Sequence, residues 1–213
     1  MDMISLITNT HEYALGTLQL SLYSDKNLIG KYSERRYKKG VAVSYFSTGH
    51  EIEIISFQLK PLAYPEQPIL DSQGWIVRII KSNDTIENLV LRCELINPKM
   101  PLEGSPETGE CLDSIGIEDA AQNWVMNIGT EDSEMLQLRA ENDDWFPNRL
   151  ATETNLTKFL DLGLEATISQ LHKGEKIYLH YLSAIAAYVE EKVGPWLAVD
   201  KSKEELEKYI GQK

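Results

Sequence analysis

The stretch Trp75–Ile96, with the sequence WIVRIIKSNDTIENLVLRCELI, decides the predicted fold of the N-terminal half. Two runs rich in β-branched and aliphatic residues, Trp75–Lys81 and Ile86–Ile96, flank the polar segment Ser82–Thr85. Strand-forming residues on both sides of a short polar turn are typical of a β-hairpin. We therefore predict a hairpin here.

Other segments of the N-terminal half also follow a strand pattern. Leu18, Leu20 and Leu22 alternate with polar residues, and a similar alternation covers 41–45. In the run 50–59 the apolar phase changes by one residue between Ile54 and Ile55. Such a change indicates either a β-bulge or a strand that is buried on both faces.

The second half shows a different periodicity. Residues 97–109 contain three prolines and two glycines, which predicts a long loop or linker. Beyond it, apolar residues recur with helical spacing in 117–128, 164–171 and 177–188. Residues 135–139 and 196–199 are expected to be short strands. A capping box, Ser202-Lys-Glu-Glu205, predicts a final helix that ends before Gly211.

Strands followed by helices, without alternation of the two, are typical of an α+β protein. We predict an N-terminal antiparallel β-rich half, built from hairpins, packed against a C-terminal helical half. The chain 1–213 is expected to form a single α+β domain, with a subdivision into 1–97 and 110–213 left open.

Charge is distributed unevenly along the chain. Residues 110–144 hold ten acids and one base, a local charge of −9 out of a net −12 for the whole protein. This sign disfavours nucleic acid and anionic membranes, and it attracts basic partners or metal cations. The stretch 141–149 adds large aromatic residues beside acids, as in interface anchors. The predicted partner-binding residues are Asp132, Glu134, Asp143, Asp144 and Trp145. A solvated surface, with Trp145 packed on the core, is the structural alternative.

The basic run Lys31–Lys39 contains five bases, one acid and two tyrosines. Bases interleaved with aromatic residues occur in phosphate and single-stranded nucleic-acid sites. The acidic composition of the whole chain opposes nucleic acid. A solvated basic loop and self-association with the acidic segment, giving a homo-oligomer, are the other interpretations.

Motifs of several enzyme classes are absent from the sequence. It contains no P-loop, no dinucleotide-binding glycine motif, no nucleophile elbow and no zinc or EF-hand spacing, so we predict no cofactor and no metal. No basic, apolar leader precedes the first strand, and no apolar run spans a membrane, so a cytoplasmic location is expected. Buried Cys93 and loop Cys111 are expected to be free thiols.

These observations favour a non-catalytic cytoplasmic protein-binding module that uses an acidic surface. An immunity or inhibitor-type protein is one concrete version. The alternative is a hydrolase or transferase with a carboxylate and histidine site between the two halves. Its acid–base candidates are His180, Glu190 and Asp144.

Overall fold

The computed structural model describes residues 4–25, 30–47, 49–59, 67–109, 112–152, 156–190 and 193–211. Two antiparallel sheets and a few short helices make up this part of the chain. The strands are β1 (Ile4–Glu12), β2 (Thr17–Ser24), β3 (Lys31–Tyr37), β4 (Gly40–Ser47), β5 (His50–Phe57), β6 (Asp71–Ser82), β7 (Ile86–Ile96), β8 (Leu102–Thr108), β9 (Leu112–Asp119), β10 (Trp124–Glu131), β11 (Thr157–Leu160), β12 (Gly163–Leu171) and β13 (Ile177–Ala187). The helices are α1 (Ser133–Asn142), η1 (Asn148–Thr152), α2 (Gly194–Val199) and α3 (Lys203–Ile210).

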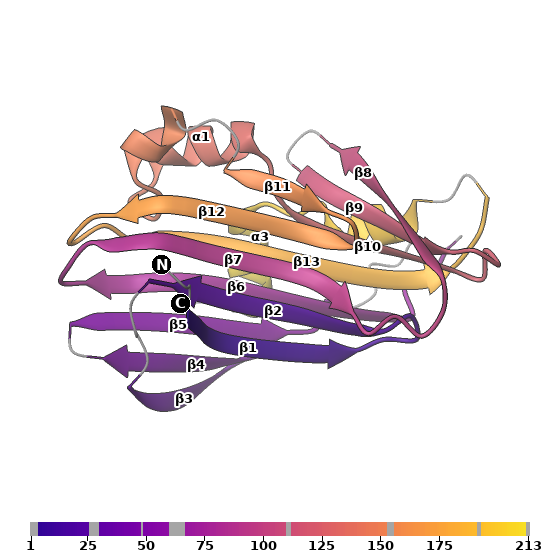
Figure 1. The fold of residues 1–213 in the computed structure, drawn as a ribbon, viewed down its shortest axis with the longest axis horizontal. Helices are drawn as coiled ribbons and strands as arrows, with labels where there is room; N and C mark the ends of the chain where they lie inside the picture. Colours follow the sequence, from indigo (N-terminus) through magenta and orange to yellow (C-terminus); the bar gives the residue numbers. More distant parts are fainter. Residues whose placement is uncertain are drawn as a thin grey trace.

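The two sheets lie face to face (Figure 1). One has five strands in the order β1-β2-β7-β12-β11, and the other has eight in the order β3-β4-β5-β6-β13-β10-β9-β8. Both contain strands from each half of the sequence. The predicted α+β class, with a helical C-terminal half, is therefore wrong, because the described residues are mostly strand throughout.

The stretch Trp75–Ile96, which we predicted to form a hairpin, contributes to two strands that do not pair with each other. β6 pairs with β5 and β13 in the larger sheet, whereas β7 pairs with β2 and β12 in the smaller one. The segment between them therefore carries the chain from one sheet to the other. Turn chemistry alone does not distinguish this connection from a hairpin, because both require a short polar reversal.

The central strands of the larger sheet are buried on both faces, and this explains two sequence patterns. Its inner face packs on the smaller sheet, and its outer face packs on α2 and α3. In β5, Ile52 and Ile54 join the core between the sheets, while Ile55 and Phe57 join the core under the helices. The phase change near Ile54 thus marks a strand buried on both faces; the register shift of β5 lies earlier, between Glu51 and Ile52.

β13 is the central case of this double burial. Ile177, Leu179 and Tyr181 point into the core between the sheets, and Tyr178 and Leu182 into the core beneath the helices. A strand covered on both faces has a nearly continuous apolar sequence, in which helical spacings occur by coincidence. The predicted helix at 177–188 is therefore wrong, as is the one at 164–171, which is β12.

The predicted helix at 117–128 is instead the β9–β10 hairpin. Its turn is organised by the buried Asp119, whose Oδ1 accepts hydrogen bonds from the backbone N–H groups of Asn123 and Trp124 at 2.7 and 2.6 Å. Gln122 in this turn adopts a positive φ of 52°. The helical spacing of the apolar residues arose from two strands separated by a short turn.

Segment 97–109 also differs from the prediction. It contains the exposed edge strand β8, which pairs with β9 and includes Pro106. An edge strand tolerates proline because one side of its backbone needs no partner in the ladder. The segment is therefore not a linker without regular structure.

Among the helices, the sequence predicts α3 correctly. Ser202 and Glu205 form the capping box, and Gly211 ends the helix with a φ of 78°. The expected strands at 135–139 and 196–199 are wrong, because these residues belong to α1 and α2. α1 packs against η1, and its Leu136 and Ala140 extend the core between the sheets. None of the described helices is long and apolar enough to cross a membrane.

Candidate functional site

The acids of 110–144 do not form one surface. Asp119 holds the β9–β10 turn, and Glu131 is buried in an ion pair with Arg139. Asp113 accepts a hydrogen bond from Thr157 Oγ1 at 2.5 Å, and burial raises the pKa of its carboxyl group. Glu110 lies outside the described residues. Much of the local charge is therefore used inside the molecule rather than presented to a partner.

Asp143, one of the predicted partner-binding residues, connects three parts of the fold. Its Oδ2 pairs with Lys203 of α3 and lies 3.5 Å from Arg139 Nε, while its Oδ1 accepts the Trp145 N–H at 2.9 Å. Burial alone would raise its pKa, but the hydrogen bonds from Lys203 and Trp145 outweigh burial and lower it. Asp143 therefore fixes the end of α1 against α3.

Asp132 and Glu134 lie at the start of α1. Asp132 is the N-cap, and its Oδ1 accepts the Met135 N–H at 2.8 Å. Glu134 is exposed in the first turn. On the same side of the helix, one and two turns on, lie Leu138, which is 52% exposed, and the exposed Glu141. α1 thus presents an apolar side chain between two carboxylates.

A hollow of about 480 Å³ adjoins the C-terminal end of α1. We call it the acidic hollow; its walls include Asp143, Asp144, Phe146, Asn148, Glu175 and Lys176. Asp144 is exposed and makes no ion pair with any described residue. Glu175 is held by Arg149, whose Nε and Nη2 donate to its two carboxylate oxygens at 2.9 and 2.8 Å. Asp144 is therefore the carboxylate in this hollow that is open to a partner.

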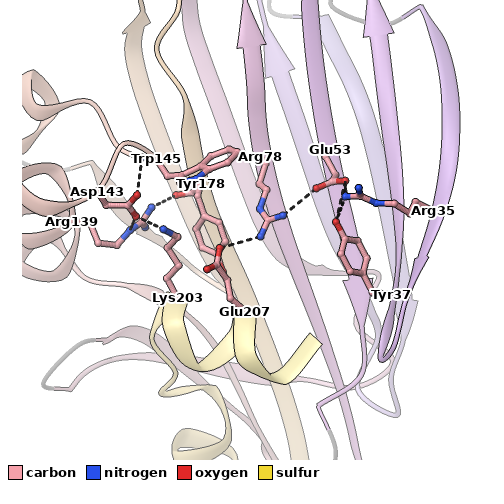
Figure 2. Close-up of polar contacts among 10 residues, drawn as sticks. All are labelled: Arg35, Tyr37, Glu53, Arg78, Arg139, Asp143, Trp145, Tyr178, Lys203 and Glu207. Carbon is pink, nitrogen blue, oxygen red and sulfur yellow. Dashed lines mark hydrogen bonds and ion pairs between the residues drawn. The ribbon is translucent and has the colours of Figure 1, made fainter. Parts of the chain in front are cut away.

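Trp145 is half-buried beside the acidic hollow and packs against the core under the helices. Lys176 Nζ lies 5.3 Å from the centre of its ring system, and Arg78 Cζ lies 5.6 Å from it. Figure 2 shows Trp145 between Asp143 and Arg78. The indole therefore has a structural role, and its use as an interface anchor stays a prediction.

A chain of polar contacts runs from Trp145 across the outer face of the larger sheet (Figure 2). Buried Arg78 on β6 pairs with Glu53 of β5 and Glu207 of α3, both at 3.2 Å. Arg35 of β3 pairs with the other oxygen of Glu53 at 2.9 Å and also contacts Tyr37 Oη. These ion pairs fasten α3 and the edge strand β3 to the sheet.

Beneath α2 and α3 lies a second, fully buried polar cluster. Arg139 Nη1 pairs with Glu131, and its Nη2 donates to the Tyr178 carbonyl at 3.0 Å. His180 Nδ1 lies 3.9 Å from Glu131 Oε2. Burial, with a smaller contribution from the positive charge of Arg139, lowers the pKa of His180 to about 3. His180 is therefore neutral at physiological pH.

The predicted acid–base set of His180, Glu190 and Asp144 is not brought together. From His180 the strand β13 continues for seven residues to Ala187, a span of roughly 23 Å, before the chain reaches the exposed Glu190. Asp144 lines the acidic hollow, whereas His180 has no exposed surface. The carboxylate beside His180 is Glu131, which sequence reasoning did not select.

No family model matches this chain, and no curated protein matches it. Among solved structures it is similar to a protein described as a putative kojibiose phosphorylase from human microbiome. The TM-score is 0.40 and the identity 8%, and the match covers 98% of this chain but only 27% of that one. A similarity of this size supports no functional argument.

Two charged residues of the network around Arg78 do leave a signal in the sequence. Arg78 interrupts the apolar run Trp75–Ile80, and Glu53 interrupts Ile52–Ile55. A charge inside a strand that is buried on both faces requires a partner, because an unpaired buried charge is costly. Recognition of the double burial would therefore have identified both as members of an ion-pair network.

Proposed function

We propose that this protein is a non-catalytic, cytoplasmic binding protein that docks a basic segment of a partner protein on α1 and the acidic hollow. The observation that carries the proposal is the exposed face of α1. Leu138 lies between Glu134 and Glu141, and Asp144 continues the negative surface into the hollow. An apolar contact surrounded by carboxylates suits a segment that alternates basic and apolar side chains.

Two properties of this surface, the fixed position of α1 and the negative charge of the protein, favour binding of a basic partner. Glu134, Leu138 and Glu141 belong to a short helix that Asp143 fixes to α3 and Arg139 fixes to the larger sheet, so a partner would meet a preorganised face. The net charge of −12 adds attraction at long range and speeds association with a basic protein at low salt. An inhibitor that covers a basic functional surface of its target is one version of this function.

Affinity capture with matched charge variants tests the proposal. The protein and the variant Glu134→Lys/Glu141→Lys/Asp144→Lys are used as bait in lysate of the source cells at low and high salt, with mass-spectrometric identification. A control variant, Asp84→Lys/Glu87→Lys/Glu103→Lys, makes the same charge change at exposed acids elsewhere. The expected result is a stoichiometric basic protein that is lost with the α1 variant and at high salt, and retained with the control.

If the α1 variant and the control variant capture the partner equally well, or equally poorly, the proposal is contradicted. The recognition surface would then lie elsewhere or be non-specific. A hydrolase or transferase receives less support from the structure, because His180 and Glu131 are buried and line no described hollow. Turnover of an ester or phosphoester substrate that is abolished by Glu131→Gln in a folded variant would favour that alternative.

A further inference from the structure

The basic run Lys31–Lys39 is divided by the sheet rather than gathered in one patch. Strand alternation places Arg35 and Tyr37 on the face that carries Glu53 and α3. Arg36 pairs in register with Val41, which is 39% exposed and belongs to the opposite face. Arg35 is engaged by Glu53. The cations that remain at this end of β3 are Arg36, at the end of the strand, and Lys38 and Lys39, in the turn to β4.

A hollow of about 560 Å³ lies beside this turn. We call it the basic hollow; its walls include Arg36, Lys38, Lys39, Tyr37, Phe57 and Tyr209. None of the described residues that line it is an acid, although the protein carries a net charge of −12. The volume lies within the range of small-molecule sites, about 300–1,000 Å³.

The apolar part of the basic hollow is held in place by its neighbours. The rings of Phe57 and Tyr209 lie 6.1 Å apart, and Tyr209 Oη donates to the Gln58 carbonyl at 2.8 Å. Gly74 makes room for Phe57, because a Cβ at that position would lie 2.4 Å from Phe57 Cζ. The half-buried rings of Tyr37 and Tyr209 are the aromatic surfaces that a ligand would meet.

The two lysines have different surroundings. Lys38 runs along the end of α3, where its Cβ would lie 3.2 Å from a Cβ placed on Gly211. A cation there is stabilised by the C-terminal carbonyl groups of the helix. Lys39 Nζ lies 4.0 Å from the centre of the Tyr209 ring and makes no ion pair with a described residue. Lys39 thus places a positive charge directly beside an aromatic surface.

We propose that the basic hollow binds a small organic anion, with a flat apolar body against Tyr209 and Tyr37 and a carboxylate or phosphate group beside Lys39. The aromatic surface and the ammonium group are adjacent, so one small molecule can contact both. A nucleic acid is disfavoured, because the acidic protein repels a polyanion much more than a ligand with one or two charges. This site is separate from the acidic hollow, so each proposal can fail alone.

Fluorescence titration with 8-anilinonaphthalene-1-sulfonate, a flat aromatic anion, tests the proposal. We expect saturable binding with one site per chain, and displacement by phenyl phosphate at lower concentration than by inorganic phosphate. Lys39→Gln should weaken probe binding about tenfold, since an interaction with a charged group is lost. Lys173→Gln, the same change at an exposed lysine of the β12–β13 turn, should leave it unchanged.

Two variants of Tyr209 distinguish a direct role of its ring in binding from an effect on folding. Tyr209→Phe keeps the aromatic surface and should retain binding, whereas Tyr209→Leu should weaken it in protein that still melts cooperatively. Equal probe binding by the Lys39→Gln variant and the unchanged protein would overturn the proposal. Displacement by inorganic phosphate as effective as by phenyl phosphate would overturn the organic class of ligand. Displacement of the probe by a single-stranded oligonucleotide at lower concentration than by phenyl phosphate would also overturn the assignment to a small organic anion.

Discussion

The acidic hollow and the basic hollow use their charges in opposite ways. In the acidic hollow, Asp143 and Glu175 are held by Lys203 and Arg149, and Asp144 is the carboxylate that remains open. In the basic hollow, Lys39 keeps its charge beside an aromatic ring without an ion pair to a described residue. Within the acidic hollow most of the carboxylates are therefore paired, whereas in the basic hollow Lys39 has no ion pair with a described residue.

The reason for this difference is the position of each segment in the fold. Residues 112–144 include β9 and β10, which are strands of the larger sheet, and α1, which extends the core between the sheets, so several of their acids lie at buried junctions and act as caps or ion-pair partners. The lysines lie in the β3–β4 turn at the edge of the larger sheet, where solvent reaches them. Charges at buried junctions serve the fold, whereas charges on the exposed face of α1 and in the edge turn are available to a partner or ligand.

The largest expected effect comes from the buried pair under the helices. Arg139→Met should lower the free energy of unfolding by about 3–5 kcal/mol, because Glu131 would be left buried without its partner. Urea unfolding monitored by tryptophan fluorescence measures this loss. The double variant Glu131→Gln/Arg139→Met should recover much of it. A double variant no more stable than Arg139→Met would show that the pair itself is not the cause.

The pH dependence of this loss follows from Glu131. Burial raises the pKa of its carboxyl group, against the opposing pull of Arg139. A raised folded-state pKa contributes stability below the unfolded value that is lost as pH rises. The Arg139→Met variant, which lacks the opposing charge, should therefore be more destabilised at pH 8 than at pH 5. A constant loss across this range would contradict the assignment.

His180 should produce the next largest effect, as acid sensitivity. Its pKa is about 3 in the folded protein and near 6.5 when unfolded, so the unfolded chain binds the extra proton between these values. Stability should therefore fall as pH decreases from 6.5, by up to ~1.4 kcal/mol per pH unit. His180→Leu, measured by urea unfolding from pH 7 to pH 4, should flatten this slope. An unchanged slope would show that other groups govern it.

Substitution of Gly74 tests how tightly Phe57, which lines the basic hollow, is packed. Gly74→Ala should cost about 1–3 kcal/mol, because the new methyl group overlaps the ring of the buried Phe57. Thermal unfolding measures the loss. Gly174→Ala is a useful contrast, since its Cβ would meet no atom within 4 Å and only its φ of 84° opposes the change. Rescue of Gly74→Ala by Phe57→Leu would confirm that the overlap is the cause.

The sequence predicts the parts of the fold whose signals are local. The helix α3 has a capping box and a C-terminal glycine, and β2 has a strict alternation, so both are identified correctly. β13 is missed because its two faces belong to two different cores, which removes the alternation. The connection from β6 to β7 is misassigned because the choice between one sheet and two depends on partners distant in the chain.

The candidate site shows the same limit. Asp144 could be found from its place in an exposed polar loop, but the role of Asp143 depends on Lys203, sixty residues later. The basic hollow needs Tyr209 from α3 and Phe57 from β5 beside the turn of β3, and no local pattern relates these residues. Sequence reasoning therefore found charged segments and could not tell which charges the fold would neutralise.

The smallest effects distinguish two neighbouring carboxylates. Asp143→Asn should lower the free energy of unfolding by about 1–2 kcal/mol, because it weakens the contacts with Lys203 and Arg139. Asp144→Asn should change it by less than about 0.5 kcal/mol, since that side chain is exposed and makes no ion pair with a described residue. Urea unfolding at pH 7 compares the two.

The pKa of Asp143 is lowered in the folded protein, so its contribution to stability is present above the unfolded pKa of about 3.9 and is lost as pH falls through the folded value. The two variants should therefore converge in stability at low pH. Equal stability already at pH 7 would show that the ion pairs of Asp143 contribute no more to folding than the exposed carboxylate of Asp144.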